Sequence, residues 1–500
     1  MPEPLPVDIG DWVALRARTH PDHVAIECGG ERLTYATLDA RVGAMAAGLR
    51  ALGGIEGEPV AVLAGNGVPI AVLAHAVPRA GALFMPLNTR LGAAEIAYQL
   101  ADSRARFLVA TGEHAAVARA AAAEAGTGVE VLAPGDARWS ALEPLAGATT
   151  IDADVPHSVI YTSGTTGRPK GAVLTHGNFA WSAVASASNL GVEADDRWLA
   201  CMPLFHVGGL SILLRSAIYG TTAVIHDRFD EVRVAAALRD DGITLLSVVA
   251  TMLTRIFDAD ARPFGASLRS VLLGGGPAPM PLLGAAARRG VPVLQTYGLT
   301  ETASQVATLA PEDALRKLGS AGLPLLTSTV RIEVDGRTAA PSEVGEILVA
   351  GPTVCAGYLH RPDATAEAIR DGWLHTGDLG SLDEEGYLVV ADRRDDLIVS
   401  GGENVYPAEV ESAILAVPGV EDCAVVGLPD ERWGHLVAAV VVGTVAPDAL
   451  AERLRDALAG YKQPRRIEAW DGPLPRTASG KLQRHLVRAR LIEAGGGARG

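Results

Sequence analysis

Residues 161–171 read YTSGTTGRPKG and follow directly on the apolar run at 157–160, which predicts a strand that ends in a loop. The stretch combines three glycines, four Ser/Thr hydroxyls and one lysine, Lys170. Glycines let backbone amides turn toward an anion, hydroxyls add donors and lysine adds charge, so the stretch predicts a phosphate-binding loop. It is not a Walker loop, because Arg168 and Pro169 precede the lysine and the proline disfavours helix at Arg168. The alternative is a Ser/Thr/Gly turn without a ligand.

The pattern of an apolar strand followed by a polar loop recurs along the chain and indicates the fold class. From Val60 to about Ala350, short β-branched runs alternate with alanine-rich helical stretches such as 231–240 and 282–289. Alternation of this kind predicts parallel sheets covered by helices. We therefore expect an α/β fold whose large N-terminal domain consists of two αβ subdomains.

The pattern changes toward the C-terminus. The runs GEILVAG (345–351) and GYLVVADR (386–393), with Gly/Asp turns nearby, predict the hairpin strands of a small β unit. The charged run ADRRDDLIVSGG (391–402) then indicates a domain boundary.

A second domain is expected after this boundary. Two helices at 407–417 and 447–458 and two strands at 420–426 and 436–442 predict a small α+β unit. The glycine-rich end AGGGARG has too little apolar content to fold. We therefore expect an N-terminal domain at 1–394, a C-terminal domain at 395–490 and a flexible tail at 491–500.

The charge balance argues against general adhesion to nucleic acid or to an anionic membrane. The 500 residues contain 43 Lys+Arg and 58 Asp+Glu, a net charge of -15. Residues 461–490 are an exception, because this segment contains eight Lys/Arg and only two acidic residues, Glu468 and Asp471. This segment is either a solvated helix face or a local site for a polyanion.

The cysteines and the N-terminus are typical of a cytoplasmic protein. The four cysteines form no CxxC pair, so neither a disulfide framework nor a zinc site is indicated. The first twenty residues lack a basic segment followed by an apolar run, and no uninterrupted apolar stretch reaches the ~18 residues of a membrane span. We expect a cytoplasmic location and no membrane insertion.

Two further loops follow predicted strands. QTYGLTET (295–302) places Glu301 beside hydroxyl donors, which suits a magnesium ion shared with phosphates. LLGGGP (272–277) places three glycines at a strand end, where bare backbone allows close approach by a flat ring. Each loop taken alone is also compatible with an ordinary turn.

Charged residues near the domain boundary and the C-terminus complete the set. In LHTGD (374–378) an aspartate, Asp378, can accept both hydroxyls of a ribose, and Arg393 can hold ribose or phosphate. PRTASGKL (475–482) presents Lys481 on a Gly/Ser loop, where a point cation can stabilise a developing phosphate charge. The alternatives are a solvated linker and an ordinary surface lysine.

Taken in their order along the chain, these motifs resemble those of the adenylate-forming superfamily of acyl-CoA synthetases, adenylation domains and luciferases. The resemblance runs from LTY (33–35) through SGGENVYPAEVE (400–411) to Lys481 and covers nearly the whole chain. Within the superfamily, MPLFHVGGL (202–210) and SQVATL (304–309) most resemble the o-succinylbenzoate–CoA ligases of menaquinone synthesis.

The resemblance implies a role for each motif residue, and a C-terminal domain that acts as a mobile lid. ATP phosphates would be bound by Thr162, Ser163, Gly164, Thr165, Thr166, Gly167 and Lys170, with Thr300 and Glu301 contributing to phosphate and magnesium binding. Adenine would be framed by Gly274, Gly275, Gly276 and Tyr297, and ribose held by Asp378 and Arg393. Lys481 would be the adenylation lysine, Asp395 the hinge, and Gly401 and Gly402 part of a tunnel for pantetheine. His206 and Ser304 would contact the acid.

The implied activity is that of an ATP-dependent acid–thiol ligase. The acid would attack the α-phosphate of ATP with Mg²⁺ present and release pyrophosphate, and the thiol of coenzyme A would then attack the acyl-adenylate carbonyl and release AMP. The family commonly has glycine before the hinge arginine, whereas Asp392 precedes Arg393 here. Because of this departure, the backbone conformation next to Arg393 can differ from that of the family, but the expected activity is unchanged.

Several alternatives stay open at this point. The acid could be another aryl or fatty acid, the acceptor could be a carrier protein, or the chain could be a nucleotide-sensing binding protein, against which Lys170, Glu301 and Lys481 argue. For an acid with a second carboxylate, Arg215 and Arg255 are candidate partners, and Gln305 and Thr308 could line the pocket. Nucleic acid is not an expected partner, and a homodimer or higher homo-oligomer is left open.

Overall fold

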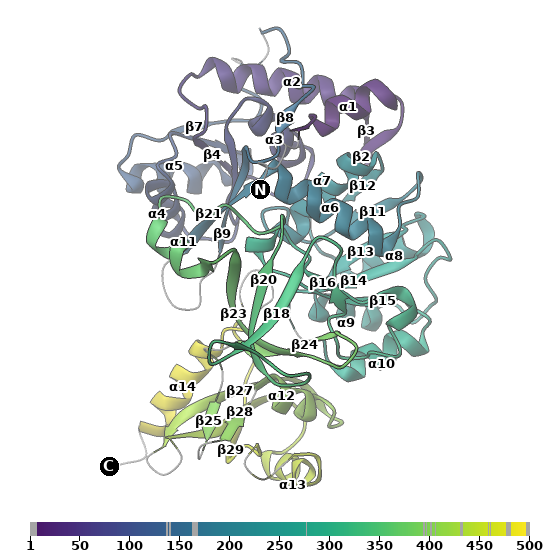
Figure 1. Cartoon of the computed structure of the whole chain (residues 1–500), viewed down its shortest axis with the longest axis vertical. Helices are drawn as coiled ribbons and strands as arrows, with labels where there is room; N and C mark the ends of the chain where they lie inside the picture. Colours follow the sequence, from purple (N-terminus) through teal and green to yellow (C-terminus); the bar gives the residue numbers. More distant parts are fainter. Residues whose placement is uncertain are drawn as a thin grey trace.

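The computed structural model describes residues 8–136, 139, 142–162, 169–276, 278–393, 396, 398–400, 403–405, 407–430, 434–458, 460, 462–476 and 482–496. Within them, two large sheets, a β unit and a small C-terminal unit follow one another (Figure 1). No helix among these residues combines the length and apolar character needed to cross a bilayer.

The first large sheet carries the strand before the phosphate loop. Its order is β21 (Gly357–Tyr358), β10 (Lys170–Thr175), β9 (Pro156–Thr162), β5 (Leu83–Pro86), β4 (Pro59–Leu63), β6 (Phe107–Ala110) and β7 (Glu130–Leu132). Strands β9 to β7 run parallel, and β4, β5 and β6 are buried at every position. Burial on both faces explains their continuous apolar runs. Three helices belong to this half: α3 (Val68–Arg79), α4 (Ala93–Ser103) and α5 (Ala115–Ala125).

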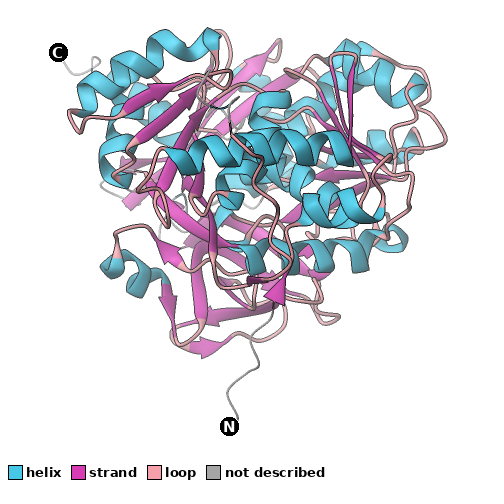
Figure 2. Ribbon diagram, turned by 90° about the horizontal axis from the view of Figure 1, so that it is seen from above, coloured by secondary structure: helices cyan, strands magenta, loops and turns pink. Residues whose placement is uncertain are grey.

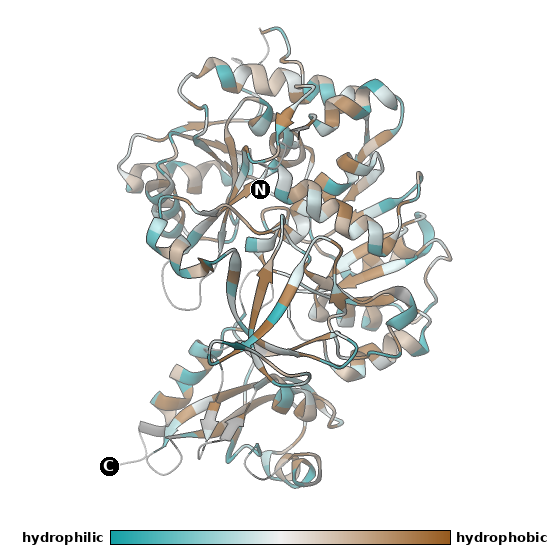
Figure 3. Ribbon diagram, in the orientation of Figure 1, coloured by the Kyte–Doolittle hydropathy of each residue, from teal (hydrophilic) through white to brown (hydrophobic). Residues whose placement is uncertain are grey.

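The second large sheet has nine strands and is also mainly parallel. Its order is β17 (Leu323–Pro324), β16 (Ala307–Thr308), β15 (Val293–Tyr297), β14 (Ser270–Leu273), β13 (Leu245–Val248), β11 (Arg197–Ala200), β12 (Thr222–Ile225), β2 (Val24–Cys28) and β3 (Glu31–Thr34). Its helices are α1 (Trp12–Thr19), α2 (Tyr35–Ala51), α6 (His176–Leu190), α7 (Val207–Tyr219), α8 (Glu231–Asp240), α9 (Ala250–Ala259) and α10 (Met280–Arg288). Seen from above, helices lie between the strands of the two large sheets as well as around them (Figure 2), and hydrophobic residues line both strands and helices (Figure 3).

The β unit is antiparallel, as the turn-rich sequence predicts. Its order is β19 (Arg337–Thr338), β18 (Thr329–Val334), β20 (Gly345–Ala350), β23 (Trp373–Leu382) and β22 (Ile369–Arg370), and β24 (Leu388–Arg393) pairs with β23. Short elements complete this part of the chain: β1 (Asp8–Ile9) paired with β8 (Ile151–Asp152), η1 (Gly112–His114), η3 (Thr300–Thr302), η4 (Pro311–Asp313) and α11 (Pro362–Ala368).

The C-terminal unit has its own sheet and its own core. The sheet order is β26 (Glu403–Val405), β25 (Ile398–Ser400), β28 (Gly434–Gly443) and β27 (Val420–Asp430), with β29 (Arg466–Ala469) parallel to β28. Its helices are α12 (Pro407–Leu415), α13 (Pro447–Ala457) and α14 (Arg484–Gly496). Two hydrophobic clusters contain only residues of this unit. The fold-class prediction, a large α/β domain followed by a small α+β domain, is confirmed.

The prediction of a tail from residue 491 is wrong for its first six residues. Helix α14 continues to Gly496, and Leu491 is 1% exposed in the cluster that packs α14 against β27 and β28. The glycine-rich composition dominated the sequence argument, but the burial of Val487 and Leu491 on one face extends the helix. Residues 497–500 lie outside the described part of the chain.

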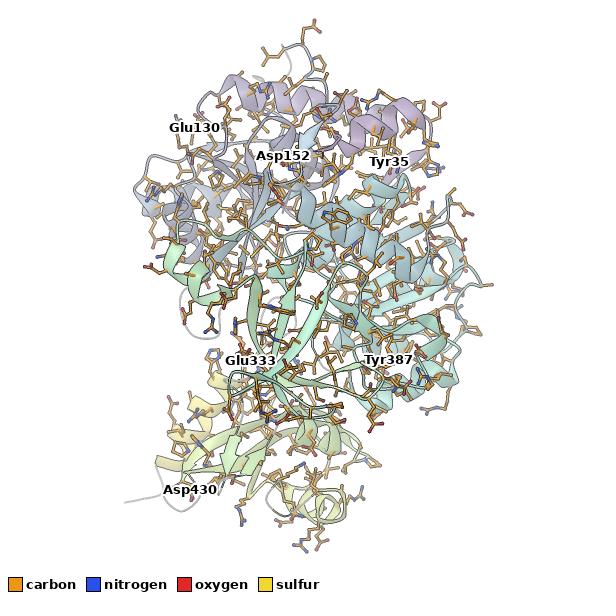
Figure 4. The ribbon with its side chains drawn as sticks, in the orientation of Figure 1. Tyr35, Glu130, Asp152, Glu333, Tyr387 and Asp430 are labelled. Atoms are coloured by element: carbon orange, nitrogen blue, oxygen red, sulfur yellow. The ribbon has the colours of Figure 1, made fainter. Side chains whose placement is uncertain are left out.

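Two polar side chains join separate parts of the large domain. The Asn66 amide, after β4, donates to the carbonyls of Met202 and His226 and accepts from Leu204 N at 2.9 Å, so it ties the first large sheet to loops of the second. The Tyr35 hydroxyl, labelled in Figure 4, lies 2.8 Å from the carbonyl oxygens at both ends of the turn after α7, Ser216 and Thr221. Because both side chains bond to backbone, they fix how the layers meet.

Three buried histidines lie between α1, α3, β9 and α6. The His157 ring stacks on Trp12 at 5.6 Å and meets the edges of His176 at 4.8 Å and Phe179 at 5.1 Å. Burial lowers the pKa of all three imidazoles, well below the ordinary value for His157 and to about 4 for His75. The folded protein therefore holds them neutral at pH 7.

We expect this cluster to make the fold sensitive to mild acid. A histidine whose folded pKa is depressed contributes stability that is fully present above ~6.5 and is lost as the pH falls toward its folded pKa. His75 alone should cost about 2 kcal/mol at pH 5. Urea unfolding of the wild type and of His75→Leu, at pH 7.5 and pH 5, checks this: the variant should lose less stability between the two. His20→Leu, which replaces an exposed histidine, is the control and should lose as much stability between the two pH values as the wild type. If His75→Leu and the wild type lose stability equally, His75 is not the source of the acid sensitivity.

Candidate active site

Two glycine-containing loops meet at the carboxyl end of the second large sheet. They follow β14 and β15, which are adjacent parallel strands. A Cβ at Gly274 would lie 2.9 Å from Thr296 Cγ2, and one at Gly276 would meet nothing within 4 Å. The first glycine therefore allows the loops to touch, and the second leaves open space above the backbone, which fits the predicted approach of a flat ring.

The loop after β15 is tightly turned back on itself. A Cβ at Gly298 would lie 1.4 Å from the Ser304 carbonyl oxygen, so no larger residue fits there. Ala303 and Ser304 both have positive φ angles, 51° and 100°. Non-glycine residues in this region are strained, and such strain concentrates at ligand-binding sites. The turn places η3, which contains Thr300 and Glu301, beside the first large sheet.

The predicted adenine and ribose residues come together across two sheets. The Tyr297 hydroxyl, at the end of β15, donates to Asp378 Oδ2 at 2.8 Å. Asp378 is 6% exposed, and its backbone faces Arg393 in the register of β23 and β24. The sequence places these three residues far apart, and the fold makes them neighbours.

Lys170 and Glu301 are brought together by a residue that the sequence analysis missed. Lys170 begins β10 directly opposite Thr162, so the phosphate loop joins two antiparallel strands. The Tyr358 hydroxyl donates to Glu301 Oε1 at 2.9 Å, and the Lys170 ammonium lies 5.3 Å from the centre of the Tyr358 ring. A cavity of about 520 Å³ borders Lys170 and is also lined by Arg361. A Gly-Tyr pair at 357–358 was the available signal, but nothing in it points to Glu301.

Part of the predicted site falls outside the described residues. This holds for Ser163, Gly164, Thr165, Thr166 and Gly167 of the phosphate loop, for Asp395, Gly401 and Gly402, for Lys481, and for the side chain of Arg393. Their roles stay predictions.

Two of the candidate acyl-binding residues, His206 and Gln305, each have a buried polar atom without a hydrogen-bond partner among the described residues. His206 precedes α7, packs on Phe205 at 4.6 Å, and has a buried Nε2 without a partner among the described residues. Burial lowers its pKa to about 4, so the ring is neutral. Gln305 donates to Thr308 Oγ1 at 3.1 Å, while its Oε1 is buried and unpartnered within the described chain. Free polar atoms of this kind fit a polar ligand.

Arg215 and Arg255 lie in very different surroundings. Arg255 is exposed and pairs with Glu231 at 2.5 Å. Arg215 is 4% exposed on α7, and one of its nitrogens donates to Ser182 Oγ at 2.9 Å, while its buried Nε has no partner among the described residues. The Ser182 hydroxyl in turn donates to the Ala303 carbonyl, next to Ser304. Arg215 therefore supplies a buried cation beside the strained turn.

The basic segment at 461–490 is largely neutralised by acids from elsewhere in the C-terminal unit. Lys462 bonds Glu409 at 2.6 Å, and Arg476 bonds Asp422 at 2.8 Å. Arg484 bonds both Asp396 and Glu411, at 3.0 and 2.7 Å. These pairs favour the solvated-face alternative for the residues concerned, because their charge is already compensated.

Comparisons with known proteins place the chain in a family. Residues 13–359 match the family described as AMP-binding enzyme, and residues 409–481 match the AMP-binding enzyme C-terminal domain. Over 486 residues the chain is 44% identical to a 2-succinylbenzoate–CoA ligase of Bacillus cereus, which covers 97% of this chain and 98% of the relative.

Two solved structures from Bacillus subtilis are similar over nearly the full length. One is o-succinylbenzoate CoA synthetase in complex with the acyl-adenylate intermediate OSB-AMP, with 40% identity, a TM-score of 0.90 and coverage of 96% of this chain and 98% of that one. The other is the same enzyme with ATP and magnesium ion, with 40% identity, a TM-score of 0.90 and coverage of 96% and 99%. The resemblance drawn from the motifs is confirmed, and the chain belongs to the AMP-binding enzyme family.

Proposed function

We propose that this protein is a 2-succinylbenzoate–CoA ligase of menaquinone biosynthesis, an AMP-forming acid–thiol ligase. The observation that carries the proposal is the near-full-length similarity to ligases of that name, together with the likeness to a structure holding the acyl-adenylate. The proposed ATP-binding residues are compatible with it, because Lys170 and the Glu301 carboxylate both contact Tyr358.

The described residues account for how ATP would be held. Thr162 and Lys170 flank the phosphate loop, Tyr297 and Asp378 lie where adenine and ribose are expected, and Glu301 faces the same region. Mg²⁺ is commonly held by one or two carboxylates together with substrate phosphates, so the single Glu301 carboxylate beside Lys170 fits that ion. When bound, the ion neutralises charge on the transferred phosphate.

We propose the domain division 1–394 and 395–490 as the basis of a two-step cycle. In the first step Lys481 on the C-terminal lid stabilises the charge that develops when the acid attacks the α-phosphate. The lid then turns about Asp395, so that Gly401 and Gly402 replace Lys481 and admit the thiol of coenzyme A. Separate hydrophobic cores in the two parts support this division.

Acid selection is proposed to depend on Arg215, His206 and Ser304. o-Succinylbenzoate carries a second carboxylate, which a buried guanidinium without a carboxylate partner in the described chain can bind. The neutral His206 ring and the polar Ser304 turn suit an aromatic keto acid. Arg255 is not proposed, because Glu231 already neutralises it.

The test is pyrophosphate release with ATP and Mg²⁺ across o-succinylbenzoate, benzoate, cinnamate, malonate and medium-chain fatty acids, with and without coenzyme A. We expect a clear preference for o-succinylbenzoate and turnover that depends on coenzyme A. Preference for another acid would retain the ligase mechanism and reject the pathway. Pyrophosphate release that does not depend on coenzyme A would favour a carrier protein as the acceptor. No pyrophosphate release with any acid would favour a nucleotide-binding protein without this activity.

The cytoplasmic location and a homo-oligomeric state remain proposals from the sequence. The net charge of -15 and the cysteines, all four free, are compatible with the location.

A further inference from the structure

Tyr358 contacts both charged groups expected at the phosphate end of the site. Its hydroxyl donates to Glu301 Oε1 at 2.9 Å, and its ring lies under the Lys170 ammonium at 5.3 Å. Among the ring contacts of the described residues, this one alone involves Lys170. Lys170 begins β10 of the first large sheet, and Glu301 lies in η3, which follows β15 of the second. One side chain therefore joins a cation of one sheet to a carboxylate in a loop of the other.

The backbone around Tyr358 is held firmly enough to position its side chain. Strand β21 pairs with β10, with Tyr358 opposite Ala172, and Tyr358 N donates to Thr365 Oγ1 at 2.9 Å. A short distance before it, Cys355 N donates to the Glu301 carbonyl at 2.8 Å. The same segment thus fixes Glu301 at both its backbone and its carboxylate.

The bond to Tyr358 leaves one carboxylate oxygen of Glu301 for a metal. Mg²⁺ requires near-octahedral geometry and takes few protein ligands, whereas larger Ca²⁺ accepts bidentate carboxylates readily. The hydrogen bond occupies one lone pair of Oε1, so it disfavours bidentate binding and leaves Oε2 as the more available oxygen for a metal.

We propose that Tyr358 is a positioning residue that orients Glu301 for monodentate binding of Mg²⁺ and supports Lys170 for binding of the ATP phosphates. This inference rests on the proposed function, because it assigns Glu301 to magnesium and Lys170 to ATP. Residues that orient a metal ligand typically change metal affinity by about 10- to 100-fold when they are replaced.

The experiment measures ATP affinity calorimetrically in the full-length protein, in EDTA and over a series of MgCl₂ concentrations, without any acid. For Tyr358→Phe, which keeps the ring, we expect unchanged affinity in EDTA and a roughly tenfold higher half-saturating Mg²⁺ concentration. For Tyr358→Leu, which also removes the ring, affinity in EDTA should fall as well.

Tyr387→Phe is a matched control. The Tyr387 hydroxyl also donates to a carboxylate, that of Asp313, and its ring lies 4.4 Å from the Lys317 ammonium, but it belongs to the β unit, where Figure 4 labels it. This variant should bind ATP and Mg²⁺ as the wild type does. The pair of variants therefore separates a general effect of removing a tyrosine hydroxyl from the proposed one.

The outcomes distinguish this inference from the proposed function. If Tyr358→Phe has the wild-type Mg²⁺ dependence, or loses affinity equally with and without Mg²⁺, Tyr358 does not orient a magnesium ligand. If Tyr358→Leu keeps wild-type affinity in EDTA, the support of Lys170 is wrong. If the wild type itself binds ATP without any effect of Mg²⁺, the assignment of Glu301 fails, and the proposed function loses its support at this site.

Discussion

Lys481→Ala is expected to lose adenylation while it retains thioester formation from supplied acyl-adenylate. The lysine would stabilise charge only while the acid attacks the α-phosphate. Removing one preorganised charge-stabilising group should cost about 3–4 kcal/mol, or roughly 10²- to 10³-fold in rate. Because the lid is proposed to turn away before the thiol enters, the second step should not depend on this residue.

The two half-reactions can be measured separately. Pyrophosphate release with ATP and o-succinylbenzoate reports the first, and coenzyme A consumption with synthetic acyl-adenylate reports the second. Arg488→Ala serves as a control, since it removes a cation from α14 in the same basic segment but lies outside the proposed site. An equal loss of both steps in Lys481→Ala would reject the alternation of two loops at one site.

Arg215→Met is expected to lower kcat/KM for o-succinylbenzoate by about 100-fold or more, with little effect on benzoate. Truncating one partner of a buried charge pair typically costs 2–5 kcal/mol, and here the proposed partner is the second carboxylate of the acid. Arg215 is 4% exposed, and the described residues provide it with the Ser182 hydroxyl but no ion-paired carboxylate. Replacing an uncompensated buried cation with an apolar side chain should not itself unfold the protein.

Arg255→Met is the matched control for this second variant, because it removes an arginine that is exposed and paired with Glu231. It should leave both acids unaffected. Steady-state kinetics with the two acids, and a thermal unfolding curve for each variant, complete the measurement. If Arg215→Met loses activity toward benzoate and o-succinylbenzoate alike, the arginine has a structural role and does not bind the second carboxylate.

Local sequence was sufficient for the elements and for the chemistry that each loop carries. Alternation of apolar runs and alanine-rich helices predicted the parallel sheets, because strands buried on both faces must be continuously apolar. In the sequence, Gly298 and the glycines at 274–276 lie in loops that follow predicted strands. In the structure, an added Cβ at Gly274 would collide with the Thr296 side chain, and one at Gly298 would collide with the Ser304 backbone. Lys170 and Glu301 were identified from residue type and position alone.

Contacts between distant residues were beyond the reach of the sequence. Tyr358 and Glu301 are 57 residues apart, and Tyr297 and Asp378 are 81 apart, so neither pair leaves a local pattern. The basic segment at 461–490 looked uncompensated because its acidic partners, such as Glu409 and Asp422, precede it in the chain.

The sequence by itself thus determined the two-part α/β architecture, the family and the position of the loops proposed to bind phosphate. These depend on periodic burial and on backbone freedom, which a few consecutive residues encode. Only the tertiary structure decided that Tyr358 orients toward Glu301, that Arg215 rather than Arg255 is a buried cation without an ion-paired carboxylate among the described residues, and that α14 continues to Gly496. Strand order and register set these contacts, and both arise from packing between segments that are remote in the chain.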